Sequence, residues 1–126
     1  MTDRAPDLIA AVVDDDERIL ESLAELLESA GHSARLFASA AALLESGSLA
    51  DIDCLISDID LPTIDGFELS RLAYAARPEL PVIFITAHHE IGNRSLPGGA
   101  GHYRLFKKPF DGQEFLTAVS DAARHS

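Results

Sequence analysis

Short apolar runs alternate along this 126-residue sequence with segments in which apolar residues have helical spacing. The clearest runs are residues 8–13 and 82–85, and each would be apolar on both faces of a strand. Strands of that kind are typical of a parallel sheet, because helices bury both of its faces. The alternation therefore predicts an α/β fold built on a parallel sheet.

The expected elements follow one another along the whole chain. Strands are expected at residues 8–13, 33–37, 54–57, 82–85 and 103–106. Helices are expected from the acids after residue 13 to Gly31, from Ser39 to Gly47, over 67–76, and from Asp111 to residue 123. A helix is also due between 87 and 101, but glycines and Pro97 oppose it. The pattern predicts a doubly wound five-stranded parallel sheet, (βα)5, with a short or irregular fourth helix.

Length, charge and cysteine content limit the class of protein. A chain of 126 residues without repeats or linkers indicates one domain over residues 1–126. Its 21 acidic and 10 basic residues give a net charge of −11, which argues against direct nucleic-acid binding and against an anionic membrane. The single cysteine, Cys54, cannot form an internal disulfide, and no apolar run approaches the roughly 20 residues that span a bilayer. We expect a soluble, cytoplasmic protein that binds a cation or a basic partner.

Polar side chains stand where the expected strands end. They are Asp14 and Asp15 after the first strand, Asp58 after the third, Thr86 after the fourth and Lys108 after the fifth. Ligands of open parallel sheets bind outside the carboxyl ends of the strands, so these residues are expected to converge there. Neighbouring carboxylates suit Mg²⁺, and a lysine beside a threonine hydroxyl suits a phosphoryl group.

Each of these residues also has a local interpretation that involves no ligand. Asp14 and Asp15 could be acids at a helix amino terminus, and Asp58 could be a turn residue. Thr86 could simply end a strand, and Lys108 could be a solvated surface lysine. Only convergence in the folded chain separates these interpretations from a shared site.

Four segments, in this order and at these separations, resemble a response-regulator receiver domain, the CheY-like domain of two-component signalling. They are VVDDD at 12–16, SDIDLPTIDG at 57–66, VIFITA at 82–87 and KPF at 108–110. The resemblance covers about residues 8–123, and the stretch 80–88 is most similar to the FixJ branch. It implies the strand order 2-1-3-4-5 and a phosphoacceptor with self-catalysed dephosphorylation rather than a turnover enzyme.

The resemblance implies a role for each acidic residue of the pattern. Asp58 would attack the phosphorus of a phosphohistidine on a sensor histidine kinase or a histidine phosphotransfer protein, and an aspartyl phosphate would form. Asp15 would ligate Mg²⁺ together with Asp58 and the backbone carbonyl of Asp60. Asp14 would hold a metal-bound water. Catalysis would consist mostly of positioning and charge neutralisation.

The resemblance also implies which residues respond to the phosphoryl group. Lys108 would pair with one phosphoryl oxygen, and Thr86 would donate its hydroxyl to another and move the loop that follows it. The side chains of Asp60 and His88 would modulate the lifetime of the aspartyl phosphate or the metal affinity. Leu105 replaces the aromatic residue usual in receivers, which puts aromatic coupling to Thr86 in question.

Two other classes of function stay open at this point. Asp58 and Asp60 resemble the nucleophile motif of haloacid-dehalogenase-type phosphatases, although Pro62 stands where that motif has Thr or Val. A receiver-like binding module that never uses phosphate is the second. Under the leading hypothesis the partners are a sensor kinase and either a target protein or an output domain outside this sequence, with a homodimer as a further expectation.

Overall fold

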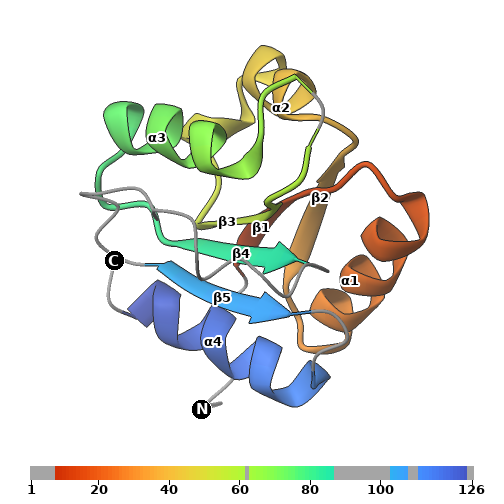
Figure 1. Ribbon diagram of the computed structural model, residues 1–126. Helices are drawn as coiled ribbons and strands as arrows, with labels where there is room; N and C mark the ends of the chain where they lie inside the picture. The colour runs from red at the N-terminus through yellow and green to blue at the C-terminus, as the bar shows by residue number, and fades with distance from the viewer. Residues whose placement is uncertain (1–7, 62, 87–102, 108–110, 125–126) are drawn as a thin grey trace.

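All neighbouring strands run parallel in the computed structural model, which describes residues 8–61, 63–86, 103–107 and 111–124 (Figure 1). They form one sheet in the order β2-β1-β3-β4-β5. The strands are β1 (Ile9–Val13), β2 (Ser33–Phe37), β3 (Cys54–Asp58), β4 (Val82–Thr86) and β5 (Tyr103–Lys107). The helices are α1 (Glu17–Ser29), α2 (Ala40–Ser46), α3 (Gly66–Ala76) and α4 (Gly112–Arg124), and the 3-10 helix η1 (Ser48–Ala50) follows α2. The predicted α/β class with a parallel sheet is confirmed.

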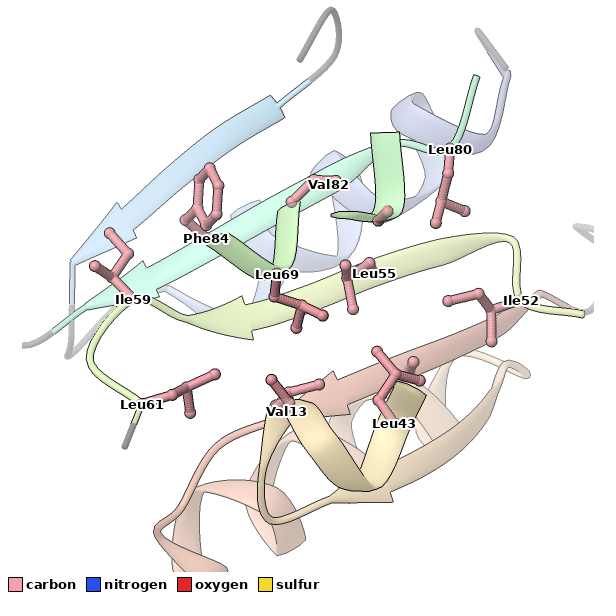
Figure 2. Packing of buried hydrophobic residues seen from close by; sticks show 13 residues of the cluster. Val13, Leu43, Ile52, Leu55, Ile59, Leu61, Leu69, Leu80, Val82 and Phe84 are labelled. Atoms are coloured by element: carbon pink, nitrogen blue, oxygen red, sulfur yellow. The ribbon is translucent and has the colours of Figure 1, made fainter. Parts of the chain in front are cut away.

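Helices cover both faces of the sheet. In Figure 1, α2 and α3 lie on one face, and α1 and α4 lie on the other. One apolar cluster, drawn in Figure 2, fills the space under α2 and α3 and includes Leu43, Leu69 and Phe84. A second cluster lies under α1 and α4 and includes Leu27 and Phe115. Every residue of β3 and β4 is buried, which explains why most of the residues in both strands are apolar.

Capping residues lie at the start of two helices and at the end of one of them, as predicted. Ser39 Oγ accepts the N–H of Ala42 at 3.1 Å where α2 begins, and Gly47 follows its end in the left-handed region with φ 77°. The carboxylate of Asp111 accepts the N–H of Glu114 at 3.1 Å where α4 begins. These interactions span only a few residues, so the local sequence is sufficient to predict them.

Several element boundaries differ by one residue from those predicted. The strands β3 and β4 each continue through the polar residue that was expected to follow them, and β5 continues one residue further than expected, to Lys107. Strand pairing uses backbone groups, so a polar side chain does not end it. The helix expected between 87 and 101 lies outside the described residues. Within the described ranges, no helix is long and apolar enough to cross a membrane.

Candidate functional site

Three carboxylates meet at the carboxyl ends of β1 and β3. The two strands are neighbours, and Val13 lies opposite Ser57 in their register. Asp14 and Asp15 follow β1 directly, and Asp58 is the last residue of β3. One oxygen from each of the three carboxylates lies within 4.8 Å of the others. The structure thus brings together these three predicted residues, which we call the acidic cluster.

The members of the acidic cluster differ in burial. Asp14 is fully buried and Asp58 is only 6% exposed, whereas Asp15 faces solvent. The N–H of Asp16 donates to Asp14 Oδ1 at 2.9 Å, and the N–H of Asp60 donates to Asp58 Oδ1 at 3.3 Å. Each buried carboxylate is therefore oriented by a backbone N–H two residues further along, as in an Asx turn. The cluster combines two oriented carboxylates with a third that solvent can reach.

Thr86 lies at the same edge of the sheet. Asp58 is the register partner of Ile85, so Thr86 is one residue further along the neighbouring strand. Its side chain is fully buried. Lys107, the last residue of β5, pairs with Thr86 in turn. The next residue, Lys108, lies outside the described residues, as do His88 and the side chain of Leu105, so their predicted roles stay predictions.

Helix α3 begins in contact with the backbone that follows β3. A Cβ atom at Gly66 would lie 2.8 Å from the Cα of Ile59 and would overlap the carbonyl oxygen of Asp58. From the sequence alone, Asp65 and Gly66 would suggest a turn in which the glycine supplies backbone freedom, and the structure contradicts this explanation. Positive φ values occur at Gly31 and Gly47, and Gly66 is not among the described residues that have one. The glycine is required because no side chain fits there.

Two polar contacts in this region were not predicted. Ser57 Oγ donates to the carbonyl oxygen of Asp58 at 2.9 Å, and Asp65 Oδ1 accepts the N–H of Glu68 at 2.9 Å to cap α3. The second has a recognisable signal, because an aspartate three residues before a glutamate is typical of a helix start. For Ser57 the only signal is a hydroxyl group within an apolar strand.

Two ionisable groups have shifted pKa values, one beside the acidic cluster and one on β3. The pKa of Asp16 is lowered, chiefly because its carboxylate accepts the backbone N–H of Arg18 at the start of α1. Burial raises the pKa of the Cys54 thiol, at the other end of β3, to about 12. Asp16 is therefore a further negative charge beside the acidic cluster at neutral pH, whereas Cys54 is a neutral core residue.

The acidic cluster has the donor set of a site for a small, hard cation. Mg²⁺ binds oxygen at about 2.1 Å, so two of its ligands lie at most about 4.2 Å apart. The carboxylate oxygens, which lie within 4.8 Å of one another, are close to that limit. The cluster could therefore hold a metal ion.

A doubly wound parallel sheet with ligating residues at the carboxyl ends of its strands defines a class of α/β proteins that bind their ligand at that edge. The family model of the response regulator receiver domain matches residues 10–120, a span that contains the whole acidic cluster and Thr86. The chain therefore belongs to the response-regulator receiver domains of two-component signalling.

Relatives and solved structures agree with this assignment. The response regulator protein TodT of Pseudomonas putida is 33% identical over 98% of this chain and 54% of its own length. The transcriptional regulatory protein FixJ of Azorhizobium caulinodans is 36% identical over 86% of this chain and 51% of its own. A receiver domain protein from Clostridium thermocellum has a TM-score of 0.84 at 26% identity, covering 93% of this chain and 94% of that chain. The chain spans about half the length of the curated relatives it matches.

Family membership decides several of the expectations from sequence. The receiver function in two-component signalling is confirmed, together with a CheY-like fold. Receiver domains are generally not turnover enzymes, and response-regulator homologues interact with sensor kinases. The matches give no support to a haloacid-dehalogenase-type phosphatase or to a phosphate-independent module. The expected lack of a nucleic-acid partner stays a prediction, since the relative NtrC of Klebsiella pneumoniae is a DNA-binding regulator.

Proposed function

We propose that this chain accepts a phosphoryl group on Asp58 from the phosphohistidine of a sensor kinase or a histidine phosphotransfer protein, with Mg²⁺ as cofactor. The observation that carries this proposal is the acidic cluster, in which two buried carboxylates and one exposed carboxylate from neighbouring strands approach within 4.8 Å. Mutual repulsion of three carboxylates opposes folding, so a purely structural role does not account for them. The binding of a cation and a phosphoryl group accounts for their presence.

The donor set supports Mg²⁺ as the cation. Asp15 and Asp58 would hold it together with the backbone carbonyl of Asp60, and Asp14 would act through a water molecule. When bound, Mg²⁺ neutralises charge on the carboxylates and on the phosphoryl oxygens. The exposure of Asp15 supports its part in this, because a largely hydrated ion can reach a carboxylate that faces solvent.

Asp58 is the nucleophile in this proposal. One carboxylate oxygen attacks phosphorus and forms an O–P bond while the N–P bond to histidine breaks. The electron pair leaves with the imidazole nitrogen, which takes up a proton from solvent. The N–H of Asp60 supports this role because it holds Oδ1 and so orients the whole carboxylate. Hydrolysis of the aspartyl phosphate would then restore Asp58, without turnover of a substrate.

Thr86 and Lys108 would bind the phosphoryl oxygens. The buried position of Thr86, one residue beyond the partner of Asp58, supports a hydroxyl donor at this edge. The loop after β4 would move with that hydroxyl and change the contacts of the domain with its partners. Lys107 pairs with Thr86 in the β4–β5 register, which supports a position for Lys108 at the same edge.

Two further parts of the proposal concern lifetime and output. The side chain of Asp60, which is exposed next to Asp58, and that of His88 would modulate the lifetime of the aspartyl phosphate. Residues 1–126 would be a single receiver domain in the cytoplasm. It would act on a target protein or on an output domain of a longer chain, and phosphorylation would switch those contacts or a homodimer interface.

Incubation with acetyl phosphate and Mg²⁺, followed by intact-mass measurement, tests the proposed function. We expect a gain of one phosphoryl group, which is lost in Asp58→Asn and when EDTA replaces Mg²⁺. Asp51→Asn is the matched control, since Asp51 is an exposed carboxylate beside η1 and should not affect the gain. An unchanged mass of the wild type would overturn the proposal, and a gain in Asp58→Asn would exclude Asp58 as the acceptor.

A further inference from the structure

One hydroxyl group interrupts the apolar layer behind the acidic cluster. Ser57 lies between Leu55 and Ile59 along the chain, and its register partners are Val13 on β1 and Phe84 on β4. All four neighbours belong to the buried cluster under α2 and α3, and Figure 2 shows them on one face of the sheet. Ser57 itself is fully buried. An apolar residue would suit these surroundings better than a serine.

The Ser57 hydroxyl has one specific interaction that offsets the cost of its burial. Ser57 Oγ donates to the carbonyl oxygen of Asp58 at 2.9 Å. The register of β3 with β1 ends at Ser57, so Asp58 is the first residue beyond that pairing. Gly66, at the start of α3, is packed against the same carbonyl. The hydroxyl therefore supplies a donor to a carbonyl that is enclosed by protein.

The carbonyl of Asp58 belongs to the peptide that begins the turn after β3. The chain continues through Ile59 to Asp60, whose N–H returns to Asp58 Oδ1 at 3.3 Å. The carbonyl of Ile59 accepts the N–H of Leu61 at 3.2 Å and that of Gly66 at 2.9 Å. Rotation of the peptide after Asp58 would therefore displace the N–H that orients the carboxylate.

We infer that Ser57 is a positioning residue for phosphoryl acceptance. Its hydroxyl holds the peptide after Asp58 and thereby the turn that orients the Asp58 carboxylate. This inference rests on the proposed function of Asp58. It adds to that function a residue whose side chain lies on the opposite face of the sheet from the side chain of Asp58. It predicts that loss of the hydroxyl slows phosphorylation of the folded protein, whereas a merely structural serine would change stability alone.

Three substitutions at Ser57 separate the hydrogen bond from side-chain volume. Ser57→Ala removes the hydroxyl, Ser57→Cys keeps the volume with only a weak donor, and Ser57→Thr keeps the hydroxyl. Ser70→Ala is the matched control, because Ser70 on α3 is also fully buried but its Oγ has no hydrogen-bond partner in the described part of the chain. The rate constant is measured by intact mass at saturating acetyl phosphate and Mg²⁺, and corrected for the folded fraction.

We expect Ser57→Ala and Ser57→Cys to lower this rate constant about three- to tenfold, the factor that corresponds to one lost hydrogen bond. Ser57→Thr should be within about twofold of the wild type, and Ser70→Ala should be unchanged. If Ser57→Ala does not fold, the rate constant of Ser57→Cys tests the inference instead.

Equal rate constants for the wild type and the folded Ser57 variants would overturn the inference and leave the proposed function intact. A slow Ser57→Thr, or an equally slow Ser70→Ala, would also overturn it, because the hydroxyl would then not be the cause. A wild type that gains no phosphoryl group would overturn the proposed function and the inference with it.

Discussion

At the scale of single residues, Gly66 contributes to the geometry of the site although it carries no charge. Gly66 allows the start of α3 to touch the backbone of Asp58 and Ile59, where no side chain fits. The pair Asp65 and Gly66 suggests only a turn when it is considered as sequence. The close approach of two segments is a property of the folded chain. The sequence alone therefore did not show why a glycine is needed at this position.

The buried thiol of Cys54 is expected to make the protein less stable at alkaline pH. Burial, with a smaller effect from the charge of Asp53, raises its pKa from 9.0 to about 12. Between these values the unfolded chain binds fewer protons than the native protein, so stability falls as the pH rises. We expect the free energy of unfolding to fall by about 1.4 kcal/mol more in the wild type than in Cys54→Ala between pH 7 and pH 10.

Urea unfolding of both proteins at the two pH values measures this difference. Because the lysines and tyrosines titrate alike in both proteins, the comparison isolates the thiol. An identical pH dependence of the two proteins would contradict a buried, neutral Cys54.

At the scale of elements, one side chain joins the ends of α3 and η1. The Nη1 atom of Arg77, which follows α3, donates to the carbonyls of Leu49 at 3.1 Å and Ile52 at 2.6 Å. Its Nε atom donates to Glu79 at 3.0 Å. The two carbonyls precede Arg77 by 28 and 25 positions, so no local sequence pattern could have predicted this connection. Helix caps, in contrast, were predictable because they join residues within one turn.

Arg77→Ala is expected to lower the free energy of unfolding by about 2 kcal/mol, because two part-buried carbonyls lose a charged donor. Arg77→Lys should restore only part of this, since an ammonium group lacks the planar fork of a guanidinium. Arg71→Ala is the control, because Arg71 pairs with Glu68 on the exposed surface of α3 and its loss should cost less than about 1 kcal/mol. Equal costs at the two positions in denaturant unfolding would be evidence against the Arg77 connection.

At the scale of the whole molecule, the acidic cluster adds to a net charge of −11. Two of its carboxylates are buried, so solvent screens their repulsion poorly. A cation that binds only the folded chain both relieves this repulsion and stabilises the fold by mass action. Stability and metal occupancy are therefore expected to be linked in this protein.

Mg²⁺ at a hundredfold excess over its dissociation constant is expected to raise the free energy of unfolding by about 2.7 kcal/mol. Asp15→Asn should remove most of this gain, because it removes the solvent-facing ligand of the acidic cluster. Glu25→Gln, at an exposed position of α1, should keep the gain. Thermal unfolding in Mg²⁺ and in EDTA compares the three proteins, and a full gain in Asp15→Asn would mean that the ion binds elsewhere.

The order of apolar runs and helical segments was sufficient to predict the α/β fold, because hydrophobic period and capping are local properties of a chain. The residues of the acidic cluster could be predicted for a related reason, since parallel strands end at one edge of a sheet. Only the tertiary structure decided that Asp15 is exposed beside a buried Asp14, that Ser57 holds the Asp58 peptide, and that Arg77 joins distant segments. These features depend on burial and on distances between segments, and both arise when the elements pack together.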